Sequence, residues 1–382
     1  MNNQQHEKNI YKHDERNHSD SLSFTRRNFL ASSMVLTASK ASLVQAKAQP
    51  NKKLGVALLG LGSYSEHQLA PALQLTQHCE LRGLVTGTPH KIETWKKKYD
   101  IADKNIYSYE NLPMIADNPD IDVIYVVTPT GTHLKFAQQS ANAGKHVWCE
   151  KPMAMTVKEC QSMIDACKKN NVRLAIGYRM QHEPNTQTII EYAKSKPYGK
   201  INRIIAKAGY AGGAPSPDDW RLSKTMGGGA LYDMGVYPIN GARYASGLNP
   251  MSVSAKHENT RPNIFTEVDE TTNLILKFEN GLVAECETSV GKKFNVLRIN
   301  CEKGWYELSP MQSYSGVNGH TSDNKKLHKS VVNQQAKQMD DDALAIIQNT
   351  KHLAPGEDGL EDIRIVEAAL QSAKTGKEVI LR

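Results

Sequence analysis

The sequence has few of the patterns that hold structural metal ions. Its six cysteines include no Cys-x-x-Cys pair, and its histidines form no cluster at metal-ligating spacing. We therefore expect no metal site. An even number of cysteines permits disulfides in an exported protein. Cys160 and Cys167, however, fall on the apolar face of a predicted helix, so we expect mostly buried thiols.

Long apolar runs and concentrated positive charge are also missing. No stretch after residue 48 approaches the roughly 20 apolar residues of a membrane-spanning helix, so we expect a soluble mature protein without stable membrane insertion. The formal charge is +7, of which residues 1–48 contribute +3 from seven Lys or Arg and four Asp or Glu. The remaining +4, spread without a basic stripe, does not favour nucleic-acid binding.

What is present begins with an export-like amino terminus. Arg26 and Arg27 precede a weakly apolar run over residues 29–44, and Ala46-Lys47-Ala48 has the small-x-small pattern of a cleavage site. The arginine pair resembles a twin-arginine signal. We predict an export signal over residues 1–48, use of the twin-arginine export machinery and a periplasmic location. The alternative is a disordered basic amino terminus.

The 382 residues suggest two domains after this extension, and the first begins with a strand, a glycine loop and a helix. An apolar run over residues 54–59 leads to Gly60-Leu61-Gly62, and a helical pattern follows over residues 66–75. Gly60 would allow a tight turn, and Gly62 would let a pyrophosphate approach the amides at the helix start. The third glycine of the usual pattern is replaced by Ser65.

The next strand, over residues 80–85, indicates which dinucleotide is preferred. NAD enzymes usually place an acidic residue here to bind a ribose hydroxyl, but this chain has Thr86, Thr88 and Lys91 instead. Hydroxyls with a cation suit a 2′-phosphate, so NADP is favoured over NAD. Alternatively, Lys91 only solvates a helix start.

A third strand, over residues 123–127, ends in a turn-rich loop containing Pro129 and His133. This strand end should point toward the glycine loop. His133 would then contact the cofactor or, equally, cap the helix that follows.

The run Cys149-Glu150-Lys151-Pro152 follows another apolar strand and organises the rest of the chain. Proline favours an extended predecessor, so Lys151 should leave the carboxyl end of that strand, where open α/β sheets bind ligands. The alternative is a solvated charge pair. A further strand over residues 174–177 leads to Arg179. The alternation of strands and helices predicts a doubly wound dinucleotide-binding domain over residues 49–180.

Beyond about residue 185, strands follow one another. Asn280-Gly281 between two of them is a strong hairpin signal. We predict a substrate and oligomerisation domain over residues 181–350, an α+β domain with a large, mostly antiparallel open-faced sheet. We expect a loop over 310–335 and a carboxyl-terminal helix and strand in 351–382. One face of the sheet would cover the cofactor cleft, and the other would join subunits into a homodimer or homotetramer.

A second informative stretch lies inside this domain. Three glycines at 227–229 precede Asp233 and Tyr237, which are four residues apart and would share one face of a helix. A phenol, with its ordinary pKa of about 10, is a poor proton donor and a poorer base at neutral pH unless a cation stabilises the phenolate. Lys151 could supply that charge.

Together, Gly60-Leu61-Gly62, Glu150-Lys151-Pro152, Gly177-Tyr178-Arg179 and the run from Gly227 to Tyr237 resemble the Gfo/Idh/MocA oxidoreductase superfamily. The resemblance covers nearly all of residues 53–382, and Tyr237, Trp220-Arg221 and the twin-arginine pattern are most similar to its exported glucose-fructose oxidoreductase branch. It implies a Rossmann domain joined to an open-faced sheet domain, with Lys151, Asp233 and Tyr237 catalytic. The implied cofactor contacts are Gly60, Gly62, Tyr64, Thr86, Lys91, Pro129, His133, Glu150, Lys151, Arg179, Trp220 and Arg221.

We therefore expect hydride transfer between C1 of an aldose and the nicotinamide, with a retained NADP recycled by a second sugar. Only residues 49–53 separate the expected cleavage site from the first strand, so the long amino-terminal arm of the exported branch is not expected, which weakens the case for tight retention. The alternatives are a glycosidase of the same superfamily, a dehydrogenase that exchanges free cofactor, and a non-catalytic dinucleotide-binding protein. The glycosidases of the superfamily tend to lose the lysine of the Glu-Lys-Pro motif, which this chain keeps as Lys151. The combination of Lys151, Asp233 and Tyr237 argues against the last.

Overall fold

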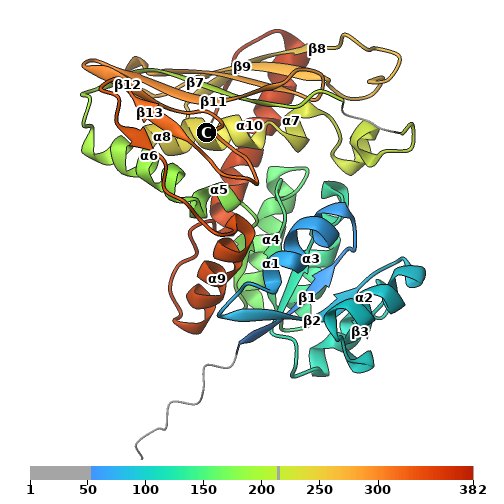
Figure 1. The fold of residues 1–382 in the computed structure, drawn as a ribbon. Helices are drawn as coiled ribbons and strands as arrows, with labels where there is room; N and C mark the ends of the chain where they lie inside the picture. Colours follow the sequence, from blue (N-terminus) through green and yellow to red (C-terminus); the bar gives the residue numbers. More distant parts are fainter. Residues whose placement is uncertain (1–52, 213–215, 382) are drawn as a thin grey trace, which may run out of the picture. The chain divides into compact units, whose positions relative to one another are not determined.

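The computed structural model describes residues 53–212 and 216–381, so the expected export signal at 1–48 lies outside the described residues. The first half contains a six-stranded sheet of order β3-β2-β1-β4-β5-β6, in which every neighbouring pair is parallel (Figure 1). Its strands are β1 (Leu54–Leu59), β2 (Cys79–Val85), β3 (Ile106–Tyr107), β4 (Val123–Val126), β5 (His146–Cys149) and β6 (Leu174–Ile176). This confirms the doubly wound Rossmann topology. β3, at the edge of the sheet, was not among the expected strands.

Helices connect these strands and bury their apolar sides against them. They are α1 (Ala70–Leu73), preceded by a π-helical turn at Ser65–Leu69, α2 (Ile92–Tyr99), α3 (His133–Asn142), α4 (Val157–Lys169) and α5 (Arg179–His182). The Thr156 side chain accepts a hydrogen bond from the Glu159 amide and begins α4 as an N-cap. Cys160 and Cys167 are buried along this helix. All six cysteines of the described residues are free and five are buried, which confirms the expected buried thiols.

The second sheet has nine strands in the order β14-β13-β12-β11-β7-β10-β9-β8-β15, and Figure 1 shows yellow-green β7 among the orange strands β8 to β13. Its strands are β7 (Ile201–Gly209), β8 (Ser252–Glu258), β9 (Thr271–Lys277), β10 (Val283–Ser289), β11 (Phe294–Cys301), β12 (Gly304–Leu308), β13 (Gly319–Thr321), β14 (Lys326–Leu327) and β15 (Val379–Ile380). All neighbouring pairs are antiparallel except β7 and β10. Asn280 and Gly281 take positive φ between β9 and β10, which confirms the predicted hairpin.

Five helices complete the second half: α6 (Pro184–Ser195), α7 (Ala230–Asp233), α8 (Val236–Ser246), α9 (Gln334–Ile347) and α10 (Gly356–Thr375). Two of these helices pack on elements of the first half. α9 adds Ala336, Met339 and Ala343 to the core of the six-stranded sheet. α10 packs on both α4 and β8, and β15 pairs with β8. The expected loop over 310–335 also contains β13 and β14.

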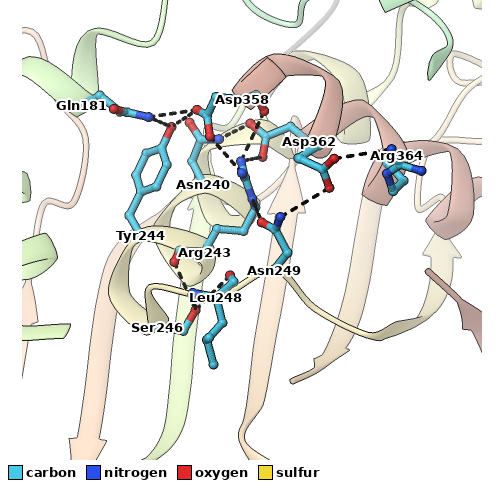
Figure 2. Close-up of polar contacts among 11 residues, drawn as sticks. Gln181, Asn240, Arg243, Tyr244, Ser246, Leu248, Asn249, Asp358, Asp362 and Arg364 are labelled. Atoms are coloured by element: carbon cyan, nitrogen blue, oxygen red, sulfur yellow. Dashed lines mark hydrogen bonds and ion pairs between the residues drawn. The ribbon is translucent and has the colours of Figure 1, made fainter. Parts of the chain in front are cut away.

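A buried polar cluster ties α10 to α8. The guanidinium of Arg243 donates to Asp358 at 2.8 Å and to Asp362 at 2.6 Å. Asp358 also accepts from Gln181 at 2.8 Å and from Tyr244 at 2.7 Å (Figure 2). We call Arg243, Asp358 and Asp362 the structural cluster. It lies well inside the protein, since Arg243 is 7% and Asp362 is 0% exposed.

A search of the helices within residues 53–212 and 216–381 finds none that is both long and apolar enough to cross a membrane.

Candidate functional site

A cavity of about 460 Å³ is lined by residues of both halves, and we call it the catalytic cavity because the three residues expected to be catalytic lie in its wall. Its wall includes the glycine loop, the ends of β2, β4 and β5, and the segment that carries the second glycine cluster. The lining residues are Gly60, Leu61, Gly62, Ser63, Tyr64, Thr86, Thr88, Lys91, Tyr109, Val127, Thr128, Pro129, Thr130, Glu150, Lys151, Gly177, Trp220, Arg221, Asp233, Tyr237 and Tyr314. Ten of the twelve residues expected to contact the cofactor are among them, as are all three expected catalytic residues; His133 and Arg179 are not.

The glycine loop has the backbone that a dinucleotide requires. Gly60 has φ +99°, and a Cβ there would lie 2.6 Å from the Val127 carbonyl oxygen, so no larger residue fits. A Cβ at Gly62 would meet no atom within 4 Å, which leaves open space beside the amides of the following helix. The Ser65 hydroxyl donates to the Gly60 carbonyl at 2.6 Å. Ser65, which replaces the third glycine, therefore stabilises the loop through this hydrogen bond.

The end of β2 lies beside this loop. Lys91 donates from Nζ to the Leu61 carbonyl at 2.7 Å, which places the ammonium against the glycine loop. The buried Thr86 hydroxyl accepts from the Thr88 amide at 3.0 Å and fixes the turn. The donors at this edge suit a phosphate on the adenosine ribose. The loop and this edge together fit a nicotinamide dinucleotide.

Lys151 and Tyr237 meet inside the cavity. The Lys151 ammonium lies 5.0 Å from the centroid of the Tyr237 ring and donates to the Asp233 backbone carbonyl at 2.7 Å. It lies 3.8 Å from the Asp233 carboxylate. The two side chains of this ion pair are 16% and 14% exposed, so water screens them only in part. An ammonium, a phenol and a carboxylate thus share one wall.

Asp233 and Tyr237 do not share one helix, contrary to the prediction from their spacing. α7 ends at Asp233 and α8 begins at Val236. Gly229, with φ +94°, turns the chain into α7, and a Cβ there would lie 2.2 Å from an Asp269 carboxylate oxygen. Asp269 in turn accepts from the Leu231 amide at 2.8 Å. A buried carboxylate, rather than helical periodicity, therefore holds this segment in place.

Asp233 is held by two further groups. Its Oδ2 accepts from the Tyr210 hydroxyl at 3.2 Å and from Arg221 Nε at 3.3 Å. We call Lys151, Asp233 and Arg221 the catalytic cluster. Burial, followed by the Asp233 carboxylate, raises the pKa of Tyr210. Tyr210 is therefore a neutral hydrogen-bond donor to Asp233.

Glu150 is buried at the inner end of the cavity. Its Oε1 accepts from Tyr125 Oη at 2.7 Å, and Tyr125 Oη accepts from Gln338 Nε2 at 3.0 Å. Gly177 makes room for the carboxylate, since a Cβ there would lie 2.6 Å from Glu150 Oε1. Burial raises the pKa of Glu150. The carboxyl group is thus held in a fixed orientation toward the cavity.

Two expected cofactor contacts lie outside the cavity wall. Arg179 is 2% exposed, with its guanidinium 5.6 Å from the Tyr237 ring centroid and 4.6 Å from that of Tyr314. Arg179 therefore packs against both aromatic rings without lining the cavity itself. His133 is buried, with Nδ1 at 3.0 Å from the Pro152 carbonyl and Nε2 at 2.7 Å from the Thr128 carbonyl. His133 therefore connects the loop after β4 with the segment after β5.

Two tyrosines are among the site residues that sequence reasoning missed. Tyr314 lines the cavity from the segment expected to be a loop, where nothing in the polar pattern marked it. Tyr210 follows β7 directly and donates to Asp233. Its position directly after a strand is the only local signal for Tyr210, since its partner Asp233 is 23 residues away in the sequence.

Comparison with known proteins agrees with this geometry. Residues 54–178 match the oxidoreductase family with an NAD-binding Rossmann fold, and residues 186–307 match the GFO/IDH/MocA C-terminal domain. Among solved structures, aldose-aldose oxidoreductase from Caulobacter crescentus, complexed with glycerol, superposes with a TM-score of 0.82 at 36% identity, covering 86% of this chain and 100% of that one.

Curated relatives include two xylose dehydrogenases. D-xylose 1-dehydrogenase (NADP(+)) of Haloarcula marismortui is 26% identical over 341 residues, which is 85% of this chain and 92% of the relative. D-xylose 1-dehydrogenase (NADP(+)) 2 of Haloferax volcanii is 23% identical over 333 residues, which is 85% of this chain and 98% of the relative. The two family matches, the nearly complete structural likeness and the dinucleotide-fitting cavity lead to one conclusion. The chain belongs to the Gfo/Idh/MocA family and is a nicotinamide-dinucleotide-dependent oxidoreductase.

Proposed function

We propose that this protein is an NADP-dependent sugar oxidoreductase that acts at C1 of an aldose. The observation that carries the proposal is the meeting of Lys151 with Tyr237 and Asp233 in the cavity that contains the glycine loop. The names of the relatives support the substrate class, since they include an aldose-aldose oxidoreductase and NADP-dependent xylose dehydrogenases.

NADP⁺ bound in the cavity would supply C4 of its nicotinamide as the hydride acceptor. Tyr237 takes the proton of the anomeric hydroxyl during oxidation, and its hydroxyl returns a proton to the carbonyl oxygen during reduction. Lys151, which lies over the Tyr237 ring, stabilises the negative charge that develops on the phenol and on the substrate oxygen. Asp233 accepts from a sugar hydroxyl and orients the ring. Oxidation converts the aldose into its lactone.

The preference for NADP rests on the donors at the end of β2. Lys91 lies against the glycine loop, where it would pair with a 2′-phosphate. A charge-assisted hydrogen bond of this kind contributes about 1.5–3 kcal/mol. We expect Lys91→Ala to weaken NADPH binding by about tenfold to a hundredfold and NADH binding much less, as measured by fluorescence titration. Equal weakening of both cofactors would contradict this role.

We further propose that the cofactor stays bound and is recycled by a second sugar. The predicted export signal at 1–48 supports this, because the twin-arginine route carries folded proteins to a compartment without an NADP pool. A lactone from the first sugar would leave before a second sugar is reduced to an alditol. Fractionation of cells that express the full chain, with and without Arg26→Lys and Arg27→Lys, tests export.

The second sheet supports our proposal of a homodimer or homotetramer. α8 and α10 pack on this sheet, while alternate side chains such as Ile275, which is 38% exposed, remain uncovered. Light scattering of the purified protein measures the mass directly. A monomer at micromolar concentration would overturn this part.

The test of the chemistry is the absorbance spectrum of the purified mature protein. We expect glucose to produce the NADPH band and fructose to remove it, without added cofactor. A band that forms only with added NADP⁺ would indicate a dehydrogenase that exchanges free cofactor. Glycoside cleavage without accumulating NADPH would indicate a glycosidase. An unchanged spectrum with every sugar and with added NADP⁺ would overturn the proposal.

A further inference from the structure

A separate cavity of about 440 Å³ lies between the carboxyl-terminal part of α4, residues 172–174 at the start of β6, and residues 351–357, which lead from α9 into α10. Its volume is within the range of small-molecule sites. None of its lining residues lines the catalytic cavity, and no step of the chemistry described above involves them. We call it the side cavity.

Backbone contacts fix the shape of the side cavity. The Ile176 amide of β6 donates to the Ala354 carbonyl at 2.8 Å, so the segment after α9 lies along this edge strand. Gly356 permits the close approach, since a Cβ there would lie 2.7 Å from the Leu174 side chain. The side cavity is therefore already formed before any ligand binds, as is usual for small-molecule sites.

Half of the lining residues are apolar or neutral. They are Ile164, Cys167, Val172, Leu174 and Pro355, of which the first, second and fourth are buried. Burial raises the pKa of the Cys167 thiol to about 12, so the thiol stays neutral and adds apolar surface instead of a nucleophile. Covering such surface with the apolar part of a ligand is favourable, because it removes the surface from water.

The charged side chains of the wall sum to +2, three cations minus one carboxylate. They are Lys168, Arg173, Lys351 and Glu357. Lys168 pairs with Glu357 at 3.0 Å, and Arg173 donates to Asn349 at 3.1 Å. Lys351 is exposed and has no hydrogen bond or ion pair within residues 53–212 and 216–381. The excess positive charge, with one unengaged ammonium, favours an anionic ligand.

His352 adds a buried polar group to the same wall. Its Nδ1 lies 2.8 Å from the Asp342 carboxylate, and the two side chains are 2% and 1% exposed. His352 lines the side cavity, whereas Asp342 does not. Nε2 of His352 is buried and has no hydrogen-bond partner in the described part of the chain. Buried polar atoms rarely remain unpaired, so a ligand oxygen in the side cavity would supply the missing partner.

We propose that the side cavity binds a small amphipathic carboxylate, such as a medium-chain fatty acid. The apolar wall would cover the alkyl chain, and the Lys351 ammonium would pair with the carboxylate. An imidazolium at His352 donates through both nitrogens, to Asp342 through Nδ1 and to the ligand through Nε2. A polyhydroxylated acid fits less well, because its hydroxyls would lie unpaired against the apolar wall. This site lies outside the proposed sugar chemistry.

Calorimetric titration of the full, cofactor-loaded protein tests the inference, with octanoate as the probe. We expect saturable binding with a dissociation constant below about 1 mM. Octan-1-ol, which has the chain without the charge, and gluconate, which has the charge without the chain, should each bind at least about tenfold more weakly. Glucose and NADPH should not displace octanoate.

Three results of this titration would overturn the inference. Octanoate binding weaker than about 1 mM would show that the side cavity is not a site for this ligand. Equal affinities for octanoate and octan-1-ol would show that charge plays no part. Displacement by NADPH or glucose would place the octanoate in the catalytic cavity instead.

A charge reversal at the rim assigns the binding to the side cavity. Lys351→Glu removes an unengaged ammonium and adds repulsion, so we expect the affinity for octanoate to fall by about five- to tenfold. The matched control is Lys374→Glu, at an exposed position on α10 that does not line the side cavity, and it should leave the affinity unchanged. Equal affinities of the two variants would contradict the proposal.

Nuclear magnetic resonance of protein with labelled histidines tests the buried contact separately. We expect octanoate to shift the imidazole signal of His352, which is assigned by its loss in His352→Gln. The shift should be much smaller with octan-1-ol, which brings no carboxylate to Nε2. A His352 signal that octanoate leaves unmoved would overturn the proposed position of the carboxylate.

Discussion

The catalytic cluster and the structural cluster consist of the same kinds of charged groups but arrange them differently. In the structural cluster, Arg243 pairs with Asp358 and Asp362 and is 7% exposed. In the catalytic cluster, Asp233 pairs with Lys151 and Arg221 at longer distances, 3.8 and 3.3 Å. The first has one cation between two carboxylates, whereas the second has one carboxylate between two cations. All three residues of the second cluster line the catalytic cavity.

The comparison shows how far hydrogen bonds engage the charged groups of each cluster. Both carboxylates of the structural cluster accept further hydrogen bonds from neutral side chains such as Asn240 and Tyr244. Their acceptors are largely occupied, and the result is a rigid joint between α8 and α10. The Lys151 ammonium donates at hydrogen-bond distance to a backbone carbonyl and lies over a phenol ring. It retains donors for a substrate oxygen.

The largest effect should follow from removing the cation of the catalytic cluster. We expect Lys151→Met to lower kcat/KM for aldose oxidation by about 10³-fold, because developing negative charge loses its stabilising partner. Thermal stability should change little. Stopped assays of NADPH formation measure the rate, and calorimetry checks the fold. Lys158→Met, at an exposed position on α4, is the control and should retain full activity.

Breaking the structural cluster should have the next largest effect, on stability instead of chemistry. We expect Arg243→Met to lower the free energy of unfolding by about 3–5 kcal/mol, because the buried Asp362 and the half-buried Asp358 lose the cation that they share. Urea unfolding followed by fluorescence measures the loss. Arg203→Met, which removes an exposed pair with Glu285, should cost much less. Equal losses would show that burial does not distinguish the two pairs.

Asp362 should give the structural cluster a pH dependence. Full burial raises its pKa from 3.8 to about 7, and the neighbouring Asp358 carboxylate adds to the effect while Arg243 opposes it. The folded state therefore holds a proton that the unfolded state releases. The contribution of this proton to the free energy of unfolding is complete below pH 3.8, the ordinary pKa of the carboxyl group. The contribution is lost as the pH rises toward about 7, by up to about 1.4 kcal/mol per pH unit.

Unfolding experiments between about pH 4 and 7 can detect this term, which arises from the raised pKa of Asp362. We expect the wild-type free energy of unfolding to contain a component that falls across this range and is absent from Asp362→Asn. A variant with the same pH slope as the wild type would assign the titration to another group.

The smallest effect should come from Tyr210, which touches the catalytic cluster only through Asp233. Removing its hydroxyl with Tyr210→Phe leaves the carboxylate with its two cations, so we expect kcat/KM to fall by no more than about tenfold. The change should appear in KM for the sugar, because Asp233 orients substrate. Tyr198→Phe, which removes a hydrogen bond to Asp323 far along the sequence, is the matched control and should leave KM unchanged.

Much of the fold could be predicted because its signals are local. The glycine loop at Gly60 and the hairpin at Asn280 require backbone conformations that few residues adopt, and the structure has positive φ at both. The helix beginning after Thr156 carries its own N-cap. Packing between distant segments left no comparable mark. α9 was therefore not expected in the core of the six-stranded sheet, more than 250 residues from His78, whose amide donates to Asp340 of this helix.

The site residues show the same difference between local signals in the sequence and packing between distant segments. Gly60, Lys151 and Asp233 sit in motifs and line the cavity, as expected. His133 has the same sequence context whether it contacts a ligand or braces two loops, and only its buried contacts with Pro152 and Thr128 distinguish these roles. Tyr314 could not be found, since an aromatic residue in a polar segment has no periodic partner.

The sequence alone determined the alternation of strands and helices, the glycine turns and the residues at the strand ends, because these depend on dihedral preferences and on the period of apolar side chains. Only the tertiary structure decided that the Lys151 ammonium meets Asp233, 82 residues away, and lies over the Tyr237 ring. That meeting depends on how two sheets and the helices between them pack. Such packing is set by the sum of many weak contacts rather than by any one stretch of the chain.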